Sequence, residues 1–313
     1  MLSIIVPIYN VQEYIRQCLD SILSQSYKDY NVILVDDSSN DNSYNICLEY
    51  TNKYSNFKVY QKENGGLSDA RNYGLKFVTT PYITFLDSDD YLNKDTYLLM
   101  MKKIIIEDLD IVISDIKFCF DSNKDFILKG LKNIDISLNK RLLLSPMFAW
   151  NKIYRLSYFN SIGLLYPKGL WFEDIPITSL LFVISDKIGY INYIGYNYRQ
   201  RNDSIMSTFN DKVNDIFIIL EMVYNNFKDR NLLDKYYDEI EYLFIEQLML
   251  YNQFRFIKSD NYRLYYIKSY QFMIKYYKNY KKNKYIKNLG FKNKLFIKYL
   301  NNYNIKYVRR VIK

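Results

Sequence analysis

The first hundred residues alternate between short apolar runs and amphipathic segments, and this alternation restricts the fold more than any other feature of the chain. The apolar runs have the length of strands and occupy residues 2–6, 31–35, 57–60 and 82–86. Between them, apolar residues recur at helical spacing, as in residues 15–22. Strands that alternate with helices form a mostly parallel sheet, so we predict an α/β fold in which helices flank such a sheet.

The chain contains no histidine, which removes the commonest general base and transition-metal ligand. Acid–base chemistry is therefore left to carboxylates, tyrosines or lysines. The three cysteines, Cys18, Cys47 and Cys119, are far apart and form no thiolate metal motif. We expect any metal to be held by oxygen, which favours magnesium or manganese over zinc.

Two observations concern the compartment in which the protein works. Isolated cysteines suit a reducing cytoplasm. No leader precedes the first predicted strand, and no apolar stretch reaches the roughly 18 to 20 residues that span a bilayer. We expect a cytoplasmic protein that is neither exported nor transmembrane.

The net charge of +9 is unevenly distributed along the chain. Residues 251–313 hold 17 Lys and Arg against one acidic residue, whereas residues 1–250 hold 26 against 33. A basic tail of this kind indicates attraction to a polyanion, either nucleic acid or an anionic membrane surface. The alternative is a tail that is only solvated, because lysine and tyrosine are abundant throughout the chain.

A cluster of carboxylates is the sharpest candidate for chemistry. Asp87, Ser88, Asp89 and Asp90 directly follow the apolar run at 82–86. In an open α/β sheet, ligands bind beyond the carboxyl ends of the strands, and paired carboxylates there can hold a hard divalent cation against phosphate oxygens. The alternative is a solvated loop, but crowded carboxylates repel one another unless a cation offsets them.

Polar or aromatic residues also end two other predicted strands. Asp37 follows the run at 31–35, where its carboxylate can accept the N3 proton of uracil. Helix capping is the alternative, although the neighbouring serines suit that role better. Pro7 and Tyr9 end the first strand, where they either flank a flat base or serve only the fold.

A glycine pair precedes the third predicted helix. Gly65 and Gly66 lack Cβ atoms and permit close backbone approach, and the helix after them is expected to present its amides and Arg71 to anionic oxygens. This arrangement favours phosphate binding. The alternative is a simple tight turn, since the sequence matches neither G-x-G-x-x-G nor the P-loop.

Five segments in one order carry a resemblance to a known family. They are Val6-Pro7-Ile8-Tyr9-Asn10, Val35-Asp36-Asp37-Ser38-Ser39, Asn64-Gly65-Gly66-Leu67-Ser68-Asp69-Ala70-Arg71-Asn72-Tyr73-Gly74, Leu86-Asp87-Ser88-Asp89-Asp90 and Trp171-Phe172-Glu173-Asp174. Together they resemble the family-2 inverting glycosyltransferases with the GT-A fold, which transfer a sugar from a nucleotide diphosphate donor. We therefore expect a GT-A, Rossmann-like catalytic domain over residues 1–205 and a helical, basic region over 206–313.

The resemblance implies a role for each donor-binding motif. Asp37 would read the base, and Arg71 would lie near the base and the diphosphate. Asp87 would face the ribose and the metal, with Ser88 beside it in the donor site. Asp89 would be the direct ligand of Mn²⁺ or Mg²⁺, the Lewis acid that neutralises the departing diphosphate.

The resemblance also implies a base, since inversion needs a group that takes the acceptor proton opposite the leaving group. Glu173 and Asp174 match the family's acidic pair, with Asp174 as the base. The alternative is an acidic helix start favoured by the helix dipole. Trp150 and Trp171 are expected either to cover sugar rings or to lie in the core.

Two further segments look like those of bacterial members. They are Asn151-Lys152 and the stretch at 198–205, where Arg199 or Arg201 is a candidate to close over the diphosphate. We therefore expect a UDP-sugar donor, a hexose or N-acetylhexosamine as the transferred group, and a hydroxyl of a growing cell-surface glycan, lipid-linked or not, as the acceptor.

Expectations for the basic tail are less specific. It carries no recognisable nucleic-acid motif, so we expect no nucleic-acid partner, and it is predicted to contact the inner face of the membrane or to take part in an oligomer. Two other functions remain open. A nucleotidyl- or phosphotransferase could use the same metal–nucleotide site without the acidic pair, and a non-catalytic basic binding protein would not need the carboxylates at all.

Overall fold

A computed structural model describes residues 1–299 of the chain, except residues 123, 202–210, 257 and 260. It divides into two compact units, Met1–Arg201 and Asn202–Lys313. The predicted boundary at residue 205 lies outside the described residues and stays a prediction. None of the helices that the structure describes is long and apolar enough to cross a membrane.

The first unit is built on a nine-stranded sheet in the order β3-β2-β1-β4-β8-β6-β9-β5, with β7 paired to β6. Its strands are β1 Leu2–Ile8, β2 Tyr30–Asp36, β3 Phe57–Gln61, β4 Tyr82–Phe85, β5 Tyr91–Leu92, β6 Ile111–Phe120, β7 Phe126–Leu128, β8 Lys152–Arg155 and β9 Ile188–Gln200. The four strands predicted in the first hundred residues are confirmed as β1 to β4.

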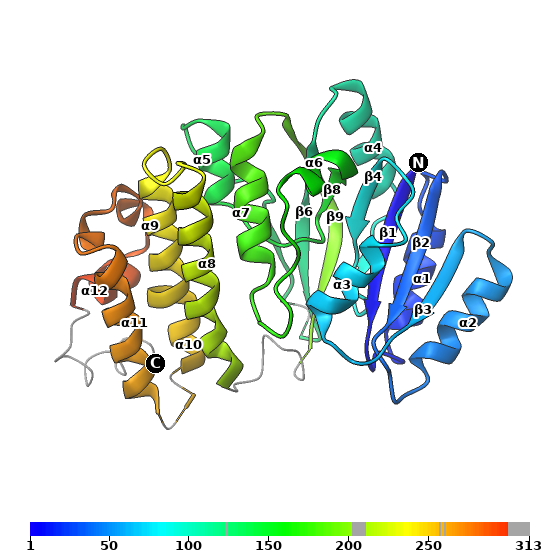
Figure 1. Cartoon of the computed structure of the whole chain (residues 1–313), viewed down its shortest axis with the longest axis horizontal. Coiled ribbons are helices and arrows are strands. Elements are labelled where there is room, and N and C mark those ends of the chain that lie inside the picture. The colour runs from blue at the N-terminus through cyan, green and yellow to red at the C-terminus, as the bar shows by residue number, and fades with distance from the viewer. Residues whose placement is uncertain (123, 202–210, 257, 260, 300–313) are drawn as a thin grey trace. The chain divides into compact units, whose positions relative to one another are not determined.

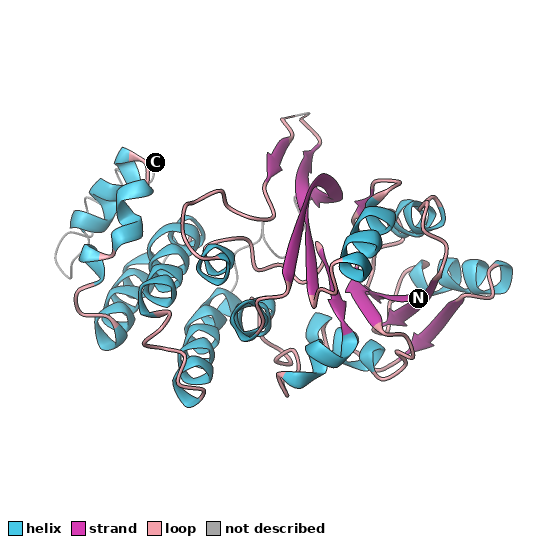
Figure 2. Ribbon diagram, turned by 90° about the horizontal axis from the view of Figure 1, so that it is seen from above, coloured by secondary structure: helices cyan, strands magenta, loops and turns pink. Residues whose placement is uncertain are grey.

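Helices lie on both faces of this sheet (Figure 2). They are α1 Ile15–Leu23, α2 Ser43–Lys53, α3 Leu67–Leu75, α4 Thr96–Ile106, α5 Leu138–Leu143, α6 Leu156–Ser161 and α7 Asp174–Ile184. The apolar residues that predicted the first helix, at positions 15, 18, 19 and 22, are all fully buried. Helix α3 packs against β1 and β2, which puts its first turn beside the ends of those strands (Figure 1).

The parallel half of the sheet determines where a ligand can bind. β3, β2, β1 and β4 run parallel, so their carboxyl ends lie at one edge of the sheet, here called the carboxyl edge. The chain passes from β1 to β2 and β3 on one side and returns to β4 on the other. Such a reversal opens a crevice outside the strand ends. Tyr9, Asp37 and Lys62 directly follow β1, β2 and β3, and Asp87 lies two residues after the end of β4.

The other half of the sheet is mixed, and it brings different parts of the chain to the same edge. β8 runs antiparallel to β4, so its first residue, Lys152, lies near the end of β4. The last part of β9 pairs with β5 and places Arg199 beside the turn that holds Asp87 to Asp90. Because these pairings join distant segments, the local sequence pattern does not predict them.

The second unit is helical, as predicted. It contains α8 Asp215–Asp229, α9 Tyr237–Ile245, a π-helical turn at Glu246–Tyr251, α10 Asn252–Phe256, α11 Tyr262–Tyr276 and α12 Phe291–Tyr299, with short 3₁₀ turns at Asp211–Asn214, Tyr280–Lys282 and Lys284–Asn288. Phe244 lies at its centre, with the rings of Phe272, Tyr276 and Tyr277 within 6.0 Å. Aromatic residues of the basic tail therefore form the core of this unit.

We predict that Phe244→Ala lowers the free energy of unfolding of the second unit by about 3–5 kcal/mol, because it removes a fully buried ring from an aromatic cluster. Urea denaturation of the full chain measures this change. The matched control is Phe291→Ala, since Phe291 is 77% exposed and should change stability by less than about 0.5 kcal/mol. Equal effects of the two substitutions would contradict this view of the core.

Candidate active site

One buried arginine joins three of the predicted motifs. Arg71 lies on α3 with only 1% of its surface exposed. Its Nη1 donates to Oε1 of Glu173 at 2.8 Å and to Oδ1 of Asp174 at 2.7 Å, and its Nη2 donates to Oδ1 of Asp87 at 2.8 Å. The acidic pair and the first carboxylate after β4, far apart in the sequence, therefore meet around a single guanidinium group.

The surroundings of Arg71 explain how its charge is kept inside the protein. Burial alone would lower the pKa of Arg71, but the three carboxylates outweigh it and raise this pKa well above its ordinary value. The rings of Phe85 and Tyr166 lie 5.9 and 5.4 Å from the guanidinium carbon. We predicted that Arg71 would face phosphate oxygens; in this structure its Nη atoms donate to the protein's own carboxylates instead.

The pKa values of both carboxyl groups of the acidic pair are raised. Burial, together with Asp174, raises the pKa of Glu173 to about 7, although Arg71 opposes the shift. Burial also raises the pKa of Asp174, against Arg71 and the backbone N–H of Ala149, which donates to Oδ2 at 3.0 Å. A base is most effective when its pKa lies near the working pH.

The backbone before the acidic pair is strained. Phe172 has a φ of +65°, in the left-handed region that bulky residues rarely adopt. Helix α7 starts two residues later at Asp174, so the turn at Phe172 sets the point from which the acidic pair projects. No sequence signal marks a phenylalanine for this conformation.

Asp89 and Asp90 are held by the end of β9. Asp89 forms an ion pair with Nη2 of Arg201 at 2.9 Å, and its carbonyl oxygen accepts from Nε of Arg199 at 2.9 Å. The carboxylate of Asp90 accepts from the hydroxyl of Tyr196 at 2.8 Å and from the backbone N–H of Arg199 at 2.7 Å. The protein's own donors and arginines thus offset the crowded carboxylates.

The three acidic residues of this turn have different roles. Burial, followed by the charges of Asp89 and Asp87, raises the pKa of Asp90 well above its ordinary value. Asp90 is almost fully buried, as is Ser88, so Asp90 serves to fasten β9 to the turn. Asp87 and Asp89 are only half-buried and remain the candidates for metal binding.

Within the described part of the chain, no three His, Cys, Asp or Glu side chains are grouped to hold a metal ion. A cation at Asp87 and Asp89 would therefore need further oxygen ligands, which a diphosphate can supply. Each of the two carboxylates contacts a cationic side chain, Arg71 and Arg201 respectively, so a cation there would bind beside these ion pairs or replace them.

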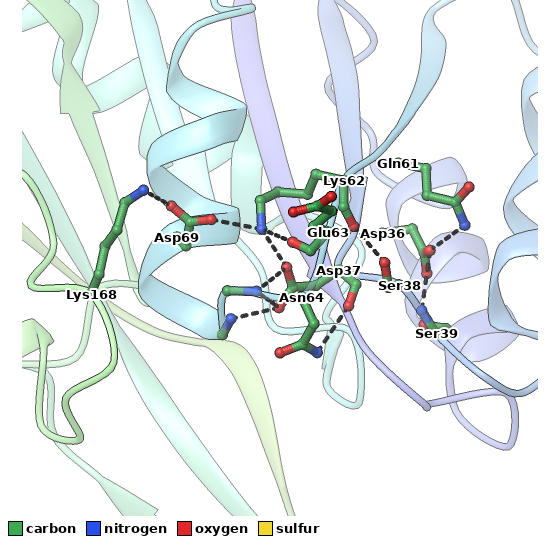
Figure 3. Close-up of polar contacts among 12 residues, drawn as sticks. Asp36, Asp37, Ser38, Ser39, Gln61, Lys62, Glu63, Asn64, Asp69 and Lys168 are labelled. Atoms are coloured by element: carbon green, nitrogen blue, oxygen red, sulfur yellow. Dashed lines mark hydrogen bonds and ion pairs between the residues drawn. The ribbon is translucent and has the colours of Figure 1, made fainter.

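Asp37 is bound to the glycine turn (Figure 3). Its Oδ1 accepts from the backbone N–H of Gly65 at 2.9 Å and from Nζ of Lys62 at 2.6 Å, and its Oδ2 accepts from the N–H of Gly66 at 2.7 Å. Gly66 has a φ of +83°, which glycine adopts without strain. The carboxylate and the turn, predicted separately, therefore form one structure.

A line of alternating charges extends from Asp37 (Figure 3). Nζ of Lys62 also pairs with Oδ2 of Asp69 at 2.6 Å, and Lys168, from the loop before α7, pairs with the other oxygen of Asp69. A Cβ atom at Gly65 would collide with the Asp69 side chain, so this line requires glycine there. Lys62 was not predicted as a site residue, although it directly follows β3 as Asp37 follows β2.

The aromatic and proline candidates have different positions. Pro7 is buried within β1, whereas Tyr9 is 47% exposed directly after that strand. Trp150 is buried and stacks on Phe148 and Tyr196, with ring centroids 4.5 and 4.0 Å away, which makes it a core residue. Tyr9 therefore remains the better candidate for a contact with a flat base.

Comparison with known proteins identifies the family of the chain. The family model described as Glycosyl transferase family 2 matches residues 3–163. Glycosyltransferase GlyG of Streptococcus pneumoniae is 30% identical over 77% of this chain and 89% of its own length. Glycosyltransferase GlyA of the same species is 32% identical over 67% of this chain, which spans 32% of GlyA.

The fold is similar to that of a solved structure. The crystal structure of S. aureus TarS 1–349 in complex with UDP-GlcNAc has a TM-score of 0.71 to this chain and is 22% identical in sequence. The match covers 99% of this chain and 90% of that one. On the family match and this likeness of fold, the chain belongs to Glycosyl transferase family 2 and has the GT-A fold, with a helical region after the α/β unit.

Proposed function

We propose that this glycosyltransferase moves a hexose or N-acetylhexosamine from a UDP-sugar to a hydroxyl of a growing cell-surface glycan, with inversion and with the help of a divalent cation. The observation that supports it most is the contact of Arg71 with both Asp87 and the Glu173–Asp174 pair. This contact supports the proposal because transfer from a metal-bound diphosphate would need the metal ligand, proposed to be Asp87, close to the proposed base.

The donor is proposed to bind along the carboxyl edge. Tyr9 would cover the base, and Oδ2 of Asp37 would accept a hydrogen bond from its N3–H. The N–H of Gly65 is 3.2 Å from this oxygen and 2.9 Å from Oδ1, so its bond to Oδ2 is the weaker of the two. The turn at Gly65 and Gly66 would approach the diphosphate. The structurally similar TarS was solved in complex with UDP-GlcNAc, which supports a UDP-sugar as the donor here.

Asp89 and Asp87 would hold Mg²⁺ or Mn²⁺, with phosphate oxygens completing the coordination. Such a cation supplies Lewis-acid stabilisation of the negative charge on the leaving diphosphate. Arg201, which pairs with Asp89, and Arg199, which lies 4.9 Å over the ring of Tyr14, would turn toward the diphosphate from the end of β9. Arg71, which pairs with Oδ1 of Asp87 at 2.8 Å, would keep that carboxylate oriented.

Asp174 would take the proton of the acceptor hydroxyl, and Glu173 would share Arg71 with it. A nucleotidyl- or phosphotransferase would have no use for this pair, and a non-catalytic basic protein would need none of the carboxylates. The acceptor is proposed from the resemblance to bacterial members that build cell-surface polysaccharides.

We predict that incubation with UDP-sugars and Mn²⁺ or Mg²⁺ slowly releases UDP, and that EDTA or Asp89→Ala abolishes this release. A screen of UDP-glucose, UDP-galactose and their N-acetylated forms identifies the donor. Asp186→Ala, at an exposed position, is the control and should keep full activity. Full turnover in EDTA would overturn the metal dependence, and release of pyrophosphate instead of UDP would indicate nucleotidyl transfer.

We predict that Asp174→Asn lowers the transfer rate by roughly 100-fold or more, the usual scale for loss of a general base. Donor affinity, measured by calorimetry, should change little because asparagine keeps the shape of the side chain. Glu173→Gln is the matched variant and should retain more activity. If Glu173→Gln were inactive and Asp174→Asn nearly as active as the parent, Glu173 would be the base.

The basic tail is proposed to bind the inner face of the cell membrane, where a lipid-linked acceptor would lie. The apolar and aromatic residues of the tail give this proposal little support, because Met273, Tyr277 and Ile297 are buried in the second unit. Leu264 and Phe291, at 62% and 77% exposure, are apolar side chains that do face solvent. Exposed lysines near the membrane surface each contribute on the order of 1 kcal/mol.

We predict that the protein sediments with vesicles containing anionic lipid, and that binding weakens as salt rises. The double variant Lys282→Glu and Lys287→Glu should bind less, since both lysines are exposed in the tail. Charge reversal at exposed Lys58 and Lys76 of the first unit is the matched control. Equal recovery in the supernatant with neutral and anionic vesicles at low salt would leave the tail as a packing or assembly element.

A further inference from the structure

Lys152 is a fully buried lysine for which the mechanism above has no role. It is the first residue of β8 and has no exposed surface. Its Nζ donates to the carbonyl oxygen of Phe148 at 2.5 Å, to Oδ1 of Asn151 at 2.7 Å and to the carbonyl oxygen of Pro146 at 3.4 Å. Burial lowers the pKa of Lys152 to about 7, although Asp174 opposes the shift. Burial of an ammonium group costs free energy unless hydrogen bonds compensate it, so the contacts of Lys152 indicate a specific role.

The contacts of Lys152 fasten one short loop, residues 146–151. The hydroxyl of Tyr154 donates to the carbonyl oxygen of Ala149 at 3.0 Å, and the side-chain amide of Asn151 donates to the carbonyl oxygen of Ser114 at 2.8 Å. The stacking of Trp150 on Phe148 and Tyr196 fixes the loop from its apolar side. The loop is therefore held from β6, β8 and β9 together.

This loop makes one contact with the acidic pair. The N–H of Ala149 donates to Oδ2 of Asp174, while Arg71 binds Oδ1 of the same carboxylate. The peptide that carries this N–H joins Ala149 to Phe148, whose carbonyl oxygen accepts from Lys152. The ammonium group and the Asp174 carboxylate therefore act on opposite ends of one peptide unit.

We propose that Lys152 is a positioning residue for Asp174: by binding the Phe148 carbonyl, it holds the next N–H against Oδ2 and fixes the direction in which the carboxylate faces the acceptor. The inference rests on the proposed function, in which Asp174 is the base. Arg71 alone leaves the carboxylate free to rotate about one oxygen. The Ala149 N–H removes that rotation, which is the orientation that proton transfer needs.

The charge of Lys152 has a second effect on Asp174. Several ionisable groups surround this carboxylate: Arg71 on α3, Asp87 after β4, Lys152 and Tyr154 on β8, Tyr166 in the loop before α7, and Glu173 beside it. Among them, Arg71 and Lys152 favour the ionised carboxylate. Replacement of Lys152 by an uncharged residue should therefore raise the pKa of Asp174.

The test is Lys152→Met, which shortens the unbranched side chain by one atom and removes its charge and its donors. We expect kcat to fall roughly 10- to 100-fold with the donor KM nearly unchanged, as for other groups that orient a catalytic side chain. In the plot of kcat/KM against pH, the acidic limb should move to higher pH, because the pKa of Asp174 is raised in this variant. Lys187→Met, at an exposed position, should leave both quantities as in the parent.

Tyr154→Phe is the second variant, in case Lys152→Met does not fold. It loses only the bond to the Ala149 carbonyl and no charge, so kcat should fall several-fold, the donor KM should hold, and the acidic limb should stay in place. Thermal melting of each variant separates these effects from loss of structure.

Three results decide the matter. Parent-like kcat and pH profile in folded Lys152→Met, with Asp174→Asn inactive, would overturn the role of Lys152 and leave the proposed base intact. An active Asp174→Asn would overturn the base itself. If Lys152→Met is unfolded, parent-like kcat in Tyr154→Phe would overturn the positioning of the loop.

Discussion

The arrangement of the site depends on one guanidinium group and the three carboxylates around it. Arg71 comes from α3, Asp87 from the turn after β4, and the acidic pair from the start of α7, about 100 residues further along the chain. Removal of one member of a buried ion network leaves charges without compensation, which costs several kcal/mol. Arg71 therefore links the packing of α3 to the turn after β4 and to the start of α7.

The two halves of the sheet contribute to this assembly in different ways. Parallel strands bring the residues at their carboxyl ends to one edge, which is why Asp37, Lys62 and Asp87 meet there. The antiparallel β8 brings its amino end to that edge, and with it the loop at 146–151 that contacts Asp174. In the proposed mechanism, the parallel half of the sheet would hold the nucleotide, and the antiparallel strand would support the base.

The parts of this fold that could be predicted from the sequence are those with local signals. Four strands and the helices between them follow from periodicity, and the carboxylates stand out because they end buried strands. Other features have no local signal: the partners of Arg71, the link from Lys62 through Asp69 to Lys168, and the fastening of Asp90 by Tyr196 all join residues distant in sequence.

The structure of the basic tail also could not be predicted from its sequence. Its excess of lysine and arginine predicted contact with an anionic membrane surface. The rings of Phe272, Tyr276 and Tyr277 instead surround Phe244. Composition could not distinguish a packed tail from a membrane-bound one, because the same aromatic residues can pack in a helical core or face a membrane.

The left-handed backbone at Phe172 has a consequence for how far this protein can be stabilised. A bulky residue in that conformation costs on the order of 1–3 kcal/mol, and the cost is borne two residues before Asp174. Screening for thermostable variants would favour substitutions that relax this turn, and with it the direction of the acidic pair. A substitution at Phe172 that raises thermal stability is therefore expected to lower the turnover rate. Stabilising substitutions are better sought elsewhere in the chain.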